Sequence, residues 1–361
     1  KIMLRYSLVR LSYRILVLFG VITLIFFLFN ILPGDPARMM LGQRADISSV
    51  EAINRDLGRD KPLSVQYFGF LNDVSPISLH NMSDSASAFF FYPDRYPSAL
   101  RILSIGTTTL VIKKPYLRRS YQSKRPVSDI LAEAFVPTLI LATVAMIAAT
   151  LLGLVLGIFS ALNKDGWFDR LALVVSIIGM SLPSFFAAII IAWLFAYVLA
   201  GYTGLSMFGS LYTVDDFGRG EYINLKNLIL PAFTLAIRPL AIITELTRSS
   251  MLEVLSQDYI RTARAKGLSL YRIVTRHALR NALNPVVTAV SGWFASLMAG
   301  AVFVEYIFDW KGVGVVIVDA LEKYDFPVVM GAVLFISVLL IIINIFADLV
   351  YGILDPRIRY A

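Results

Sequence analysis

Six long apolar runs constrain this chain more than any other feature. Each is close to the roughly 20 apolar residues that a helix needs to cross the hydrocarbon core of a bilayer. The composition agrees, since 57% of the residues are hydrophobic and 16% are charged, against about 25% charged residues in soluble domains. We therefore predict an all-α, polytopic membrane protein with six transmembrane helices, which excludes most cytosolic enzymes. The predicted spans are residues 15–32, 135–162, 171–200, 228–246, 285–304 and 328–354.

The first run has two interpretations, because Arg5, Arg10 and Arg14 precede it as they would precede a secretory signal. No small-x-small cleavage pattern follows the run, which continues into Pro33-Gly34. We predict a retained signal anchor, with a cleaved secretory signal as the alternative.

Basic residues in the short loops predict the orientation, because they resist translocation across an energised membrane. This rule makes both termini and two basic loops cytoplasmic, whereas the loops at 201–227 and 308–327 are mildly acidic and lie outside. The segment 33–125 also holds basic pairs, Lys113-Lys114 and Arg118-Arg119, but it is too long for the rule to apply with force. The rule also explains the net charge of +8 without nucleic acid. We expect a multi-pass protein of the bacterial cytoplasmic (inner) membrane. The cytoplasmic segments would be residues 1–14, the loop with Lys164 and Arg170, the loop 248–284, and the tail 355–361.

The chain divides into three parts on this interpretation. Residues 1–32 form the cytoplasmic N-terminal segment and the first span, and residues 126–361 form a core of five transmembrane helices with the cytoplasmic loop 248–284. Residues 33–125 form an extracytoplasmic region between them, with a polar helical stretch at 46–67, a segment rich in Ser, Pro, Asp and Phe at 75–96, and β-branched residues suited to a strand at 101–113. This region is either a solvated loop over the outer mouth or a surface that docks a partner.

The sequence lacks the residues that several kinds of catalytic and cofactor-binding site require. None of the 22 glycines is followed by lysine, so the loop G-x-x-x-x-G-K-[ST] that cradles the phosphates of ATP is missing. Without cysteine, and with only His80 and His277 as histidines, thiolate chemistry and metal catalysis are poorly supplied, and the redox compartment stays undetermined. We expect no catalytic residue, no cofactor and no metal in this chain.

The basic loop before the fifth run has the pattern of two short helices. Ser256 can cap the first helix, Gly267 can end it in a left-handed conformation, and Ser269 can cap the second. A basic stripe at four-residue spacing then follows on the second helix, formed by Arg272, Arg276 and Arg280. The pattern favours a helix-turn-helix handle, and a basic loop resting on anionic lipid is the alternative.

The same loop carries a family resemblance. The stretch from Tyr259 to Gly267 (YIRTARAKG), followed by RHALRNA from Arg276 and by Pro285, resembles the cytoplasmic loop of bacterial ABC-importer permeases. It is most similar to the dipeptide, oligopeptide and nickel subfamily, in the member with a long first outer loop. Further matches in chain order are LPGDPA at 32–37, DKPL at 60–63, RPV at 125–127, Glu305 with Phe308, Gly312 and Gly314, DFPVV at 325–329, and DPR at 355–357. Residues 76–116 depart from the family, with about 40 residues more than such a loop needs.

This resemblance implies a permease subunit that pairs with a second, similar permease and with two cytoplasmic ATPases. ATP and Mg²⁺ would then bind to those ATPases, and an extracytoplasmic solute-binding protein would deliver the substrate. The Glu-Ala-Ala positions of the family correspond to Arg261, Thr262 and Ala263, so the family's glutamate is missing here. The residues that would couple to the ATPase are Tyr259, Arg261, Thr262, Ala263, Arg264, Ala265, Lys266 and Gly267.

The spans offer weaker hints. Gly153 with Gly157, and Gly292 with Ser296 and Gly300, form small-residue pairs at four-residue spacing, which favours helix packing over lining a path. Pro183 interrupts the third span and is a candidate hinge. A charge near the middle of a span faces either a water-filled path or an ion-pair partner, and we predict one of these for Arg238. Two acids, Glu245 and Asp348, lie near the predicted cytoplasmic ends, where we expect them to be solvated, with a functional role inside the membrane as the alternative.

Three function classes compete. The first is the permease subunit of an ATP-driven importer for di- or oligopeptides, or alternatively for nickel or another small solute. A self-sufficient secondary transporter should show internal repeats and buried acids that bind ions, and a membrane enzyme should show a nucleophile with a base. Neither pattern is evident, so we favour the importer subunit. The substrate, the sequences of its partners and the Gram type do not follow from the sequence.

Overall fold

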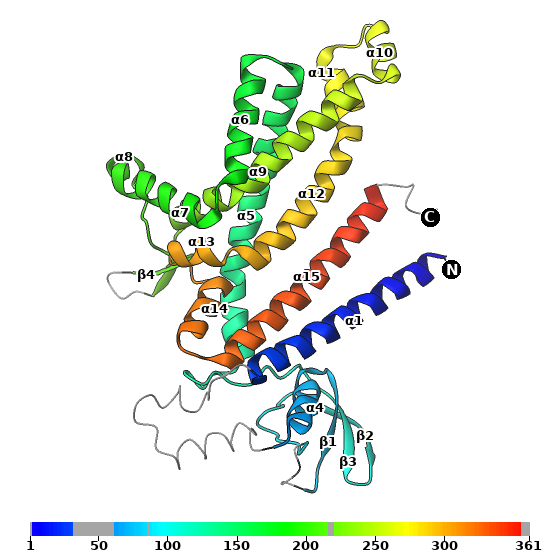
Figure 1. The fold of residues 1–361 in the computed structure, drawn as a ribbon, viewed down its shortest axis with the longest axis vertical. Helices are drawn as coiled ribbons and strands as arrows, with labels where there is room; N and C mark the ends of the chain where they lie inside the picture. Colours follow the sequence, from blue (N-terminus) through cyan, green and yellow to red (C-terminus); the bar gives the residue numbers. More distant parts are fainter. Residues whose placement is uncertain (1, 32–60, 85–86, 88, 216–219, 355–361) are drawn as a thin grey trace. The chain divides into compact units, whose positions relative to one another are not determined.

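The computed structural model describes residues 2–31, 61–84, 87, 89–215 and 220–354 (Figure 1). Two compact units make up the chain. The first combines Lys1–Glu133 with Val316–Val338, and the second combines Ala134–Val315 with Leu339–Ala361. The predicted motifs at 33–37 and 355–357, and most of the predicted helix at 46–67, lie outside the described residues.

The first unit contains a small antiparallel sheet, with strand order β1-β3-β2, and the helix Leu63–Val74 contacts β1 (Figure 1). Its core joins Ile25 and Phe26 of α1 to Phe70 of α4 and to Met330 and Leu334 of α15. The elements are α1 (Ile2–Ile31), α4 (Leu63–Val74), β1 (Ile77–Asn81), β2 (Leu100–Ile105) and β3 (Thr108–Ile112), with the start of α5 (Val127–Leu162), most of α14 (Val313–Glu322) and the first part of α15 (Phe326–Leu354).

The sheet is more extensive than the sequence indicated. The predicted strand at 101–113 is a hairpin of β2 and β3, because Gly106 takes a left-handed φ of +62° and reverses the chain. Its neighbour β1 comes from the segment that reads as a loop, and it buries the polar Ser78 and His80 while Ile77 and Leu79 are exposed. Polar side chains on the inner face conceal this strand from a search for apolar alternation.

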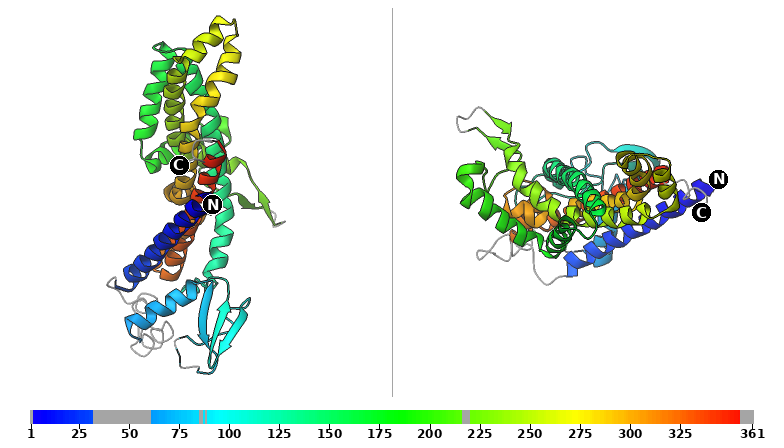
Figure 2. Two further views of the ribbon diagram at one scale, coloured as in Figure 1. Left: turned by 90° about the vertical axis from the view of Figure 1, so that its right-hand side faces the viewer. Right: turned by 90° about the horizontal axis from the view of Figure 1, so that it is seen from above.

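The second unit is a bundle of long helices with a two-stranded hairpin, β4 with β5, that projects from it (Figure 2). Its core is formed by α5, α7, α9 and α12, and α9 contributes the most buried side chains. After α5 the unit contains α6 (Trp167–Ser181), α7 (Ser184–Trp193), η2 (Leu194–Val198), α8 (Ala200–Thr203), β4 (Tyr212–Val214), β5 (Glu221–Ile223), α9 (Lys226–Leu255), α10 (Asp258–Ala265), α11 (Leu270–Arg272), η3 (Ile273–Ala278), α12 (Leu279–Gly300) and α13 (Val302–Ile307).

The α-helical membrane fold is as predicted, but the count of six transmembrane helices is not confirmed. Among the described residues, α1, α5, α9 and α15 are long and apolar enough to cross a membrane. The predicted third span is bent by 110° between α6 and α7–η2, and it makes a fifth crossing only if this bent pair counts as one. The predicted fifth span covers most of α12 and the start of α13, with a break at Ala301, and α12 is not among the helices that meet that standard.

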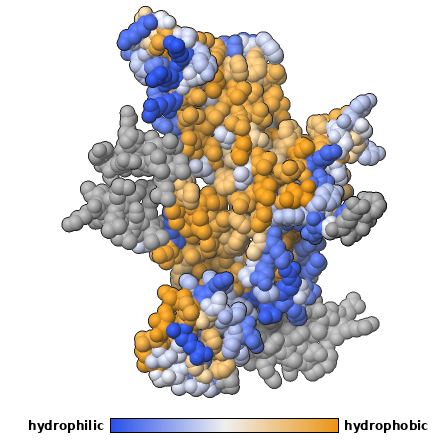
Figure 3. All heavy atoms as spheres, turned by 180° about the vertical axis from the view of Figure 1, so that it is seen from behind, coloured by the Kyte–Doolittle hydropathy of each residue, from blue (hydrophilic) through white to orange (hydrophobic). Residues whose placement is uncertain are grey.

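The surface of the helices is apolar where lipid would contact it. Orange covers much of the helical surface in Figure 3, and blue gathers on the turn between α10 and α11. The exposed side chains include Leu151, Val155 and Phe159 of α5, and Ile177 and Ile178 of α6. An apolar surface this extensive is costly in water and is the ordinary exterior of a helix in lipid.

Candidate functional site

The handle, residues 256–280, projects from the ends of α9 and α12 (Figure 1). Its first helix, α10, ends at Ala265, and Gly267 follows it in the predicted left-handed conformation, with φ of +75°. The Gly267 N–H donates to the Arg264 carbonyl at 2.9 Å, and the Leu268 N–H donates to the Ala263 carbonyl at 3.3 Å. This is the Schellman pattern, in which a left-handed glycine satisfies the last carbonyls of a helix.

Other predicted details of the handle are wrong. Ser256 does not cap α10, because its hydroxyl donates to the Glu253 carbonyl at the end of α9, and Gln257 occupies the N-cap position. Ser269 stands at the N-cap of α11 but makes no capping hydrogen bond. The second helix is not separate, because α11 continues through the π-helical turn η3 into α12. The stripe Arg272, Arg276 and Arg280 is exposed.

The handle has a small apolar core of its own and an outer face that is basic. Ile260 and Ala263 of α10 pack with Ile273, Ala278 and Met251. Ala263 is only 6% exposed, so this predicted docking residue faces inward and is not available to a partner. The remaining residues of the predicted coupling set are exposed, namely Tyr259, Arg261, Thr262, Arg264, Ala265, Lys266 and Gly267. The outer face of α10 therefore carries three cations around small residues.

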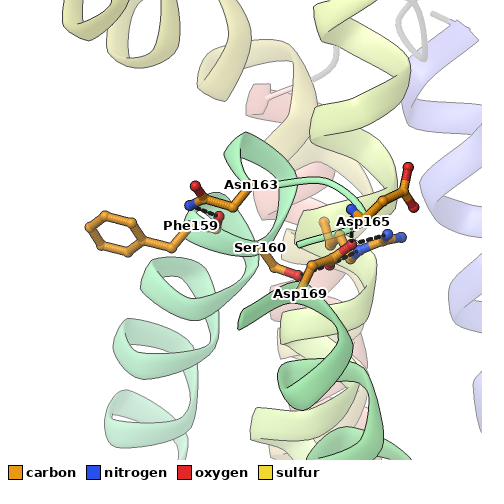
Figure 4. A network of polar contacts seen from close by, with 6 residues as sticks. Phe159, Ser160, Asn163, Asp165 and Asp169 are labelled. Carbon is orange, nitrogen blue, oxygen red and sulfur yellow. Dashed lines mark hydrogen bonds and ion pairs between the residues drawn. The ribbon is translucent and has the colours of Figure 1, made fainter. Parts of the chain in front are cut away.

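A buried ion pair lies near the base of the handle and was not anticipated (Figure 4). The Arg248 guanidinium of α9 donates to both carboxylate oxygens of Asp169 on α6, at 2.5 and 2.6 Å. Ser160 of α5 also donates to this carboxylate, and the Asp165 N–H donates to it at 2.9 Å. Asp169 is 1% exposed. One carboxylate thus joins α5, α6 and α9.

The predicted glycine pairs behave differently from one another. A Cβ at Gly153 would lie 2.8 Å from Ile243 Cγ2, and one at Gly157 would lie 2.5 Å from Thr247 Cβ, so α5 and α9 are in direct contact there. A Cβ at Gly292 would meet nothing within 4 Å, and Ser296 is exposed, so this stripe does not pack within the described chain. The surroundings of Gly300 lie outside the described residues.

Arg238 and Ser296 line one small cavity of about 80 Å³. Arg238 is exposed in the middle of α9, and Trp293 and Ser296 of α12 lie on the other side of the cavity. The break at Pro183 brings Ser184, the first residue of α7, to the same cavity. Glu245 is exposed, as we expected for a solvated acid, and the side chain of Asp348 lies outside the described residues.

A second buried carboxylate, Glu305 of α13, was anticipated only as a family match. Thr138 of α5 donates to its Oε1 at 2.7 Å, and the Gly314 N–H donates to its Oε2 at 2.7 Å. A Cβ at Gly312 would approach Glu305 Cδ at 2.5 Å, so the two glycines make room for the carboxylate. Gly312 and Gly314 thus form a cradle for the carboxylate at the start of α14. In the described part of the chain, no group of three or more His, Cys, Asp or Glu residues could hold a metal ion.

Comparison with known proteins identifies the family. Residues 153–360 match the family of binding-protein-dependent transport system inner membrane components, and residues 3–88 match the N-terminal region of such membrane components. The chain belongs to this family. The family match includes the handle, the broken α6–α7 segment and α9, and the resemblance seen in the sequence is confirmed.

Curated members of the family match this transport component along its whole length. It is 35% identical to the glutathione transport system permease protein GsiC of Pectobacterium atrosepticum over 358 residues, covering 99% of this chain and 100% of the relative. It is 33% identical to the dipeptide transport system permease protein DppB of Alkalihalophilus pseudofirmus, with the same coverage. GsiC of Escherichia coli K12 is 34% identical.

A solved structure shares the fold of this inner membrane component. The inward-facing MetNI methionine ABC transporter superposes with a TM-score of 0.51 at 16% identity, covering 63% of this chain and 97% of the matched chain. At that identity the likeness concerns the arrangement of helices alone.

Proposed function

We propose that this chain is a permease subunit of an ATP-driven importer for di- or oligopeptides and forms half of the translocation path. The observation that carries the proposal is the full-length identity of 33 to 35% to permeases of glutathione and dipeptide transport systems. No observation favours nickel or another small solute.

The handle is the surface that we assign to energy coupling. Its exposed cations Arg261, Arg264 and Lys266 would pair with acidic groups in a cleft of a cytoplasmic ATPase, and its small residues allow a close approach. The Schellman turn at Gly267 and the inward-facing Ala263 hold α10 in shape. ATP and Mg²⁺ would bind to two such ATPase subunits, and the handle and both chain termini would lie in the cytoplasm.

The buried ion pair gives this assignment a mechanical basis. Because Asp169 links α6 to Arg248 of α9, and Ser160 links it to α5, a displacement of the handle would move three helices together. Such a rigid-body movement is how closure of an ATPase pair would alternate the path between inward-facing and outward-facing states. The second half of the path would come from a second, similar permease. A solute-binding protein would deliver the substrate from outside.

Affinity purification tests the coupling role. We expect the tagged wild type, purified in mild detergent, to retain a second permease and ATPases, and to hydrolyse ATP faster when peptide and binding protein are added. The double variant Arg264→Glu with Ala265→Trp should lose the ATPases, because it reverses one charge and blocks the close approach without entering the handle core. Lys226→Glu, at the other end of α9 and also exposed, is the matched control.

Two results would contradict the proposal. A wild type that purifies alone and moves solute into liposomes without ATP would be a self-sufficient transporter. A complex that imports nickel but no peptide of two to five residues would be an importer with a different substrate.

A further inference from the structure

Arg238 holds a charge where the membrane makes a charge most costly. It lies near the middle of α9, a 30-residue helix that is long and apolar enough to span the bilayer. A charged side chain at the centre of a membrane helix costs several kcal/mol unless it meets water or an opposite charge. Within the described part of the chain, Arg238 makes no ion pair and no side-chain hydrogen bond. Water in a path, or a counter-charge from outside those residues, must therefore compensate for the charge of Arg238.

The cavity beside Arg238 has the chemistry of an anion site. The Ser184 and Ser296 hydroxyls line it and make no described hydrogen bond, whereas the Thr234 hydroxyl is already donated to the Leu230 carbonyl. Ser184 and Ala187, in the first turn of α7, both line the cavity, so the positive dipole end of that helix lies there, and no side chain caps it. A break in a membrane-spanning helix places such an end in the membrane interior.

The size of the cavity limits what can bind there. At about 80 Å³, it is smaller than the roughly 300 to 1,000 Å³ of pockets that enclose a whole small molecule. It therefore fits one group of a larger solute. Trp293 on the wall offers an apolar face for the part of the solute next to that group.

We propose that Arg238, with the first turn of α7 and Ser296, binds the C-terminal carboxylate of a peptide during its passage through the membrane. This inference rests on the proposed function and adds the group of the substrate that is recognised. A fixed guanidinium attracts a carboxylate and repels Ni²⁺, so the site favours peptides with a free C-terminal carboxylate over a metal cation.

The first experiment compares uptake of one peptide with a free C-terminal carboxylate and of its C-terminal amide. Proteoliposomes contain the complete transporter and its binding protein, and the probe is the alanine peptide of two to five residues that the wild type imports best. We expect Arg238→Gln to lower uptake of the free acid at least tenfold and uptake of the amide less than twofold. The binding protein is the same for the wild type and for Arg238→Gln. Its preference for one peptide therefore cancels when the uptake by the variant is divided by the uptake by the wild type.

Glu245→Gln is the matched control. Glu245 is exposed on the same side of α9, two turns from Arg238, and it does not line the cavity. We expect this variant to import both peptides as the wild type does.

A charge-rescue experiment separates electrostatics from packing. The chain has no cysteine, so Arg238→Cys introduces a single thiol. Modification with aminoethyl methanethiosulfonate restores a cation there. Methyl methanethiosulfonate forms the same kind of disulfide bond but adds a neutral group. We expect only the first reagent to recover uptake of the free acid, and the treated wild type controls for thiols in the other subunits.

Three results would overturn the inference. Equal losses for the acid and the amide, or equal recovery with both reagents, would make Arg238 a packing residue. Loss of the second permease from purified Arg238→Gln would assign the counter-charge to an acid of that subunit. Each result requires a wild type that imports peptide, and a wild type that imports none would instead refute the proposed function.

Discussion

Asp169 illustrates how much a single carboxylate organises in this chain. It accepts hydrogen bonds from side chains of α5 and α9, and it is almost completely buried. A buried carboxylate is tolerated only when charge and hydrogen bonds compensate for lost hydration, and here Arg248 supplies most of that compensation. Removing one partner leaves the other charge uncompensated.

We therefore expect Asp169→Asn to lower the free energy of unfolding by about 3 kcal/mol. Titration of the detergent-solubilised protein with SDS measures this loss. The exposed pair of Arg125 and Glu133, with side chains 50% and 65% accessible, is the control, and Glu133→Gln should cost less than about 1 kcal/mol. Equal losses for the two variants would mean that the buried pair has no special structural role.

Lys113 is a second buried ionisable residue, in the sheet of the first unit. Its Nζ donates to the Asp73 carbonyl at 2.5 Å and lies 4.6 Å from the centre of the Tyr96 ring. Burial lowers the pKa of Lys113 to about 8, and the nearby Asp73 opposes that shift only in part. The folded sheet therefore disfavours the charged form of this lysine.

The sign of the resulting pH dependence follows from the protons bound. Between pH 8 and the ordinary pKa of Lys near 10.5, the unfolded chain binds more protons than the folded one, so stability rises with pH. We expect protection of the β1–β3 amides from hydrogen exchange to increase about tenfold from pH 7 to pH 9, after correction for intrinsic exchange rates. This increase corresponds to a rise of about 1.4 kcal/mol in the free energy of opening.

Lys113→Met should remove this pH dependence, because methionine retains the apolar stem without the charge. The pKa of His80 is also lowered, chiefly by burial, and its effect on stability falls below pH 7, outside the tested window. Burial raises the pKa of Tyr96, which affects stability only above pH 10. A wild type whose protection does not change between pH 7 and pH 9 would show that Lys113 keeps an ordinary pKa.

At the scale of elements, the contact between α5 and α9 depends on glycine. A Cβ at Gly157 would lie 2.7 Å from the Thr244 carbonyl as well as 2.5 Å from Thr247, so added volume would push the two helices apart. We expect Gly157→Ala to lower the free energy of unfolding by about 1 to 3 kcal/mol, measured by the same SDS titration.

The matched control for this contact is another helical glycine, Gly292. A Cβ there meets nothing within 4 Å, so Gly292→Ala should be neutral or should stabilise α12 by up to about 1 kcal/mol through helix propensity. The opposite ranking of the two variants would contradict the assigned contact.

The α6–α7 segment shows how a structure can differ from the single helix that hydropathy predicts. A single apolar run covers both helices, but Pro183 has no N–H to donate, and Leu182 takes an extended conformation with ψ of 126°. The residue before a proline avoids helical geometry, so the helix stops at Ser181 and restarts at Ser184. The result is a bend of 110° at the predicted interruption of the third span.

At the scale of the whole molecule, the lack of cysteine allows the proposed orientation to be tested one position at a time. Ser269→Cys in the handle and Val214→Cys in β4 are both at exposed positions. We expect a membrane-impermeant thiol reagent to label Val214→Cys in spheroplasts, and to label Ser269→Cys only after the membrane is permeabilised. Positive charge in the loop around the handle is the physical reason.

Tyr222→Cys in β5 is the control for this topology, because β5 pairs directly with β4 and must react from the same side. Labelling of Ser269→Cys in sealed spheroplasts would invert the orientation. It would also remove the handle from the compartment that contains ATP.

The sequence by itself determined the properties that depend on short stretches of chain. Membrane class follows from the sum of apolar residues along each run, and the end of α10 follows from Gly267, because a left-handed φ is inexpensive only for glycine. Likeness to the transport family is also a linear property, and it extends over the whole chain.

The tertiary structure alone decided which distant groups meet. Asp169 and Arg248 are 79 residues apart, and no local pattern distinguishes this pair from the other acids and cations of the loops. The same holds for the inward polar face of β1, the packing of Gly157 where Gly292 has no neighbour, and the cavity that joins Arg238 to α7. Propensity and hydropathy add up residue by residue, whereas pairing and packing depend on where the whole chain brings each side chain.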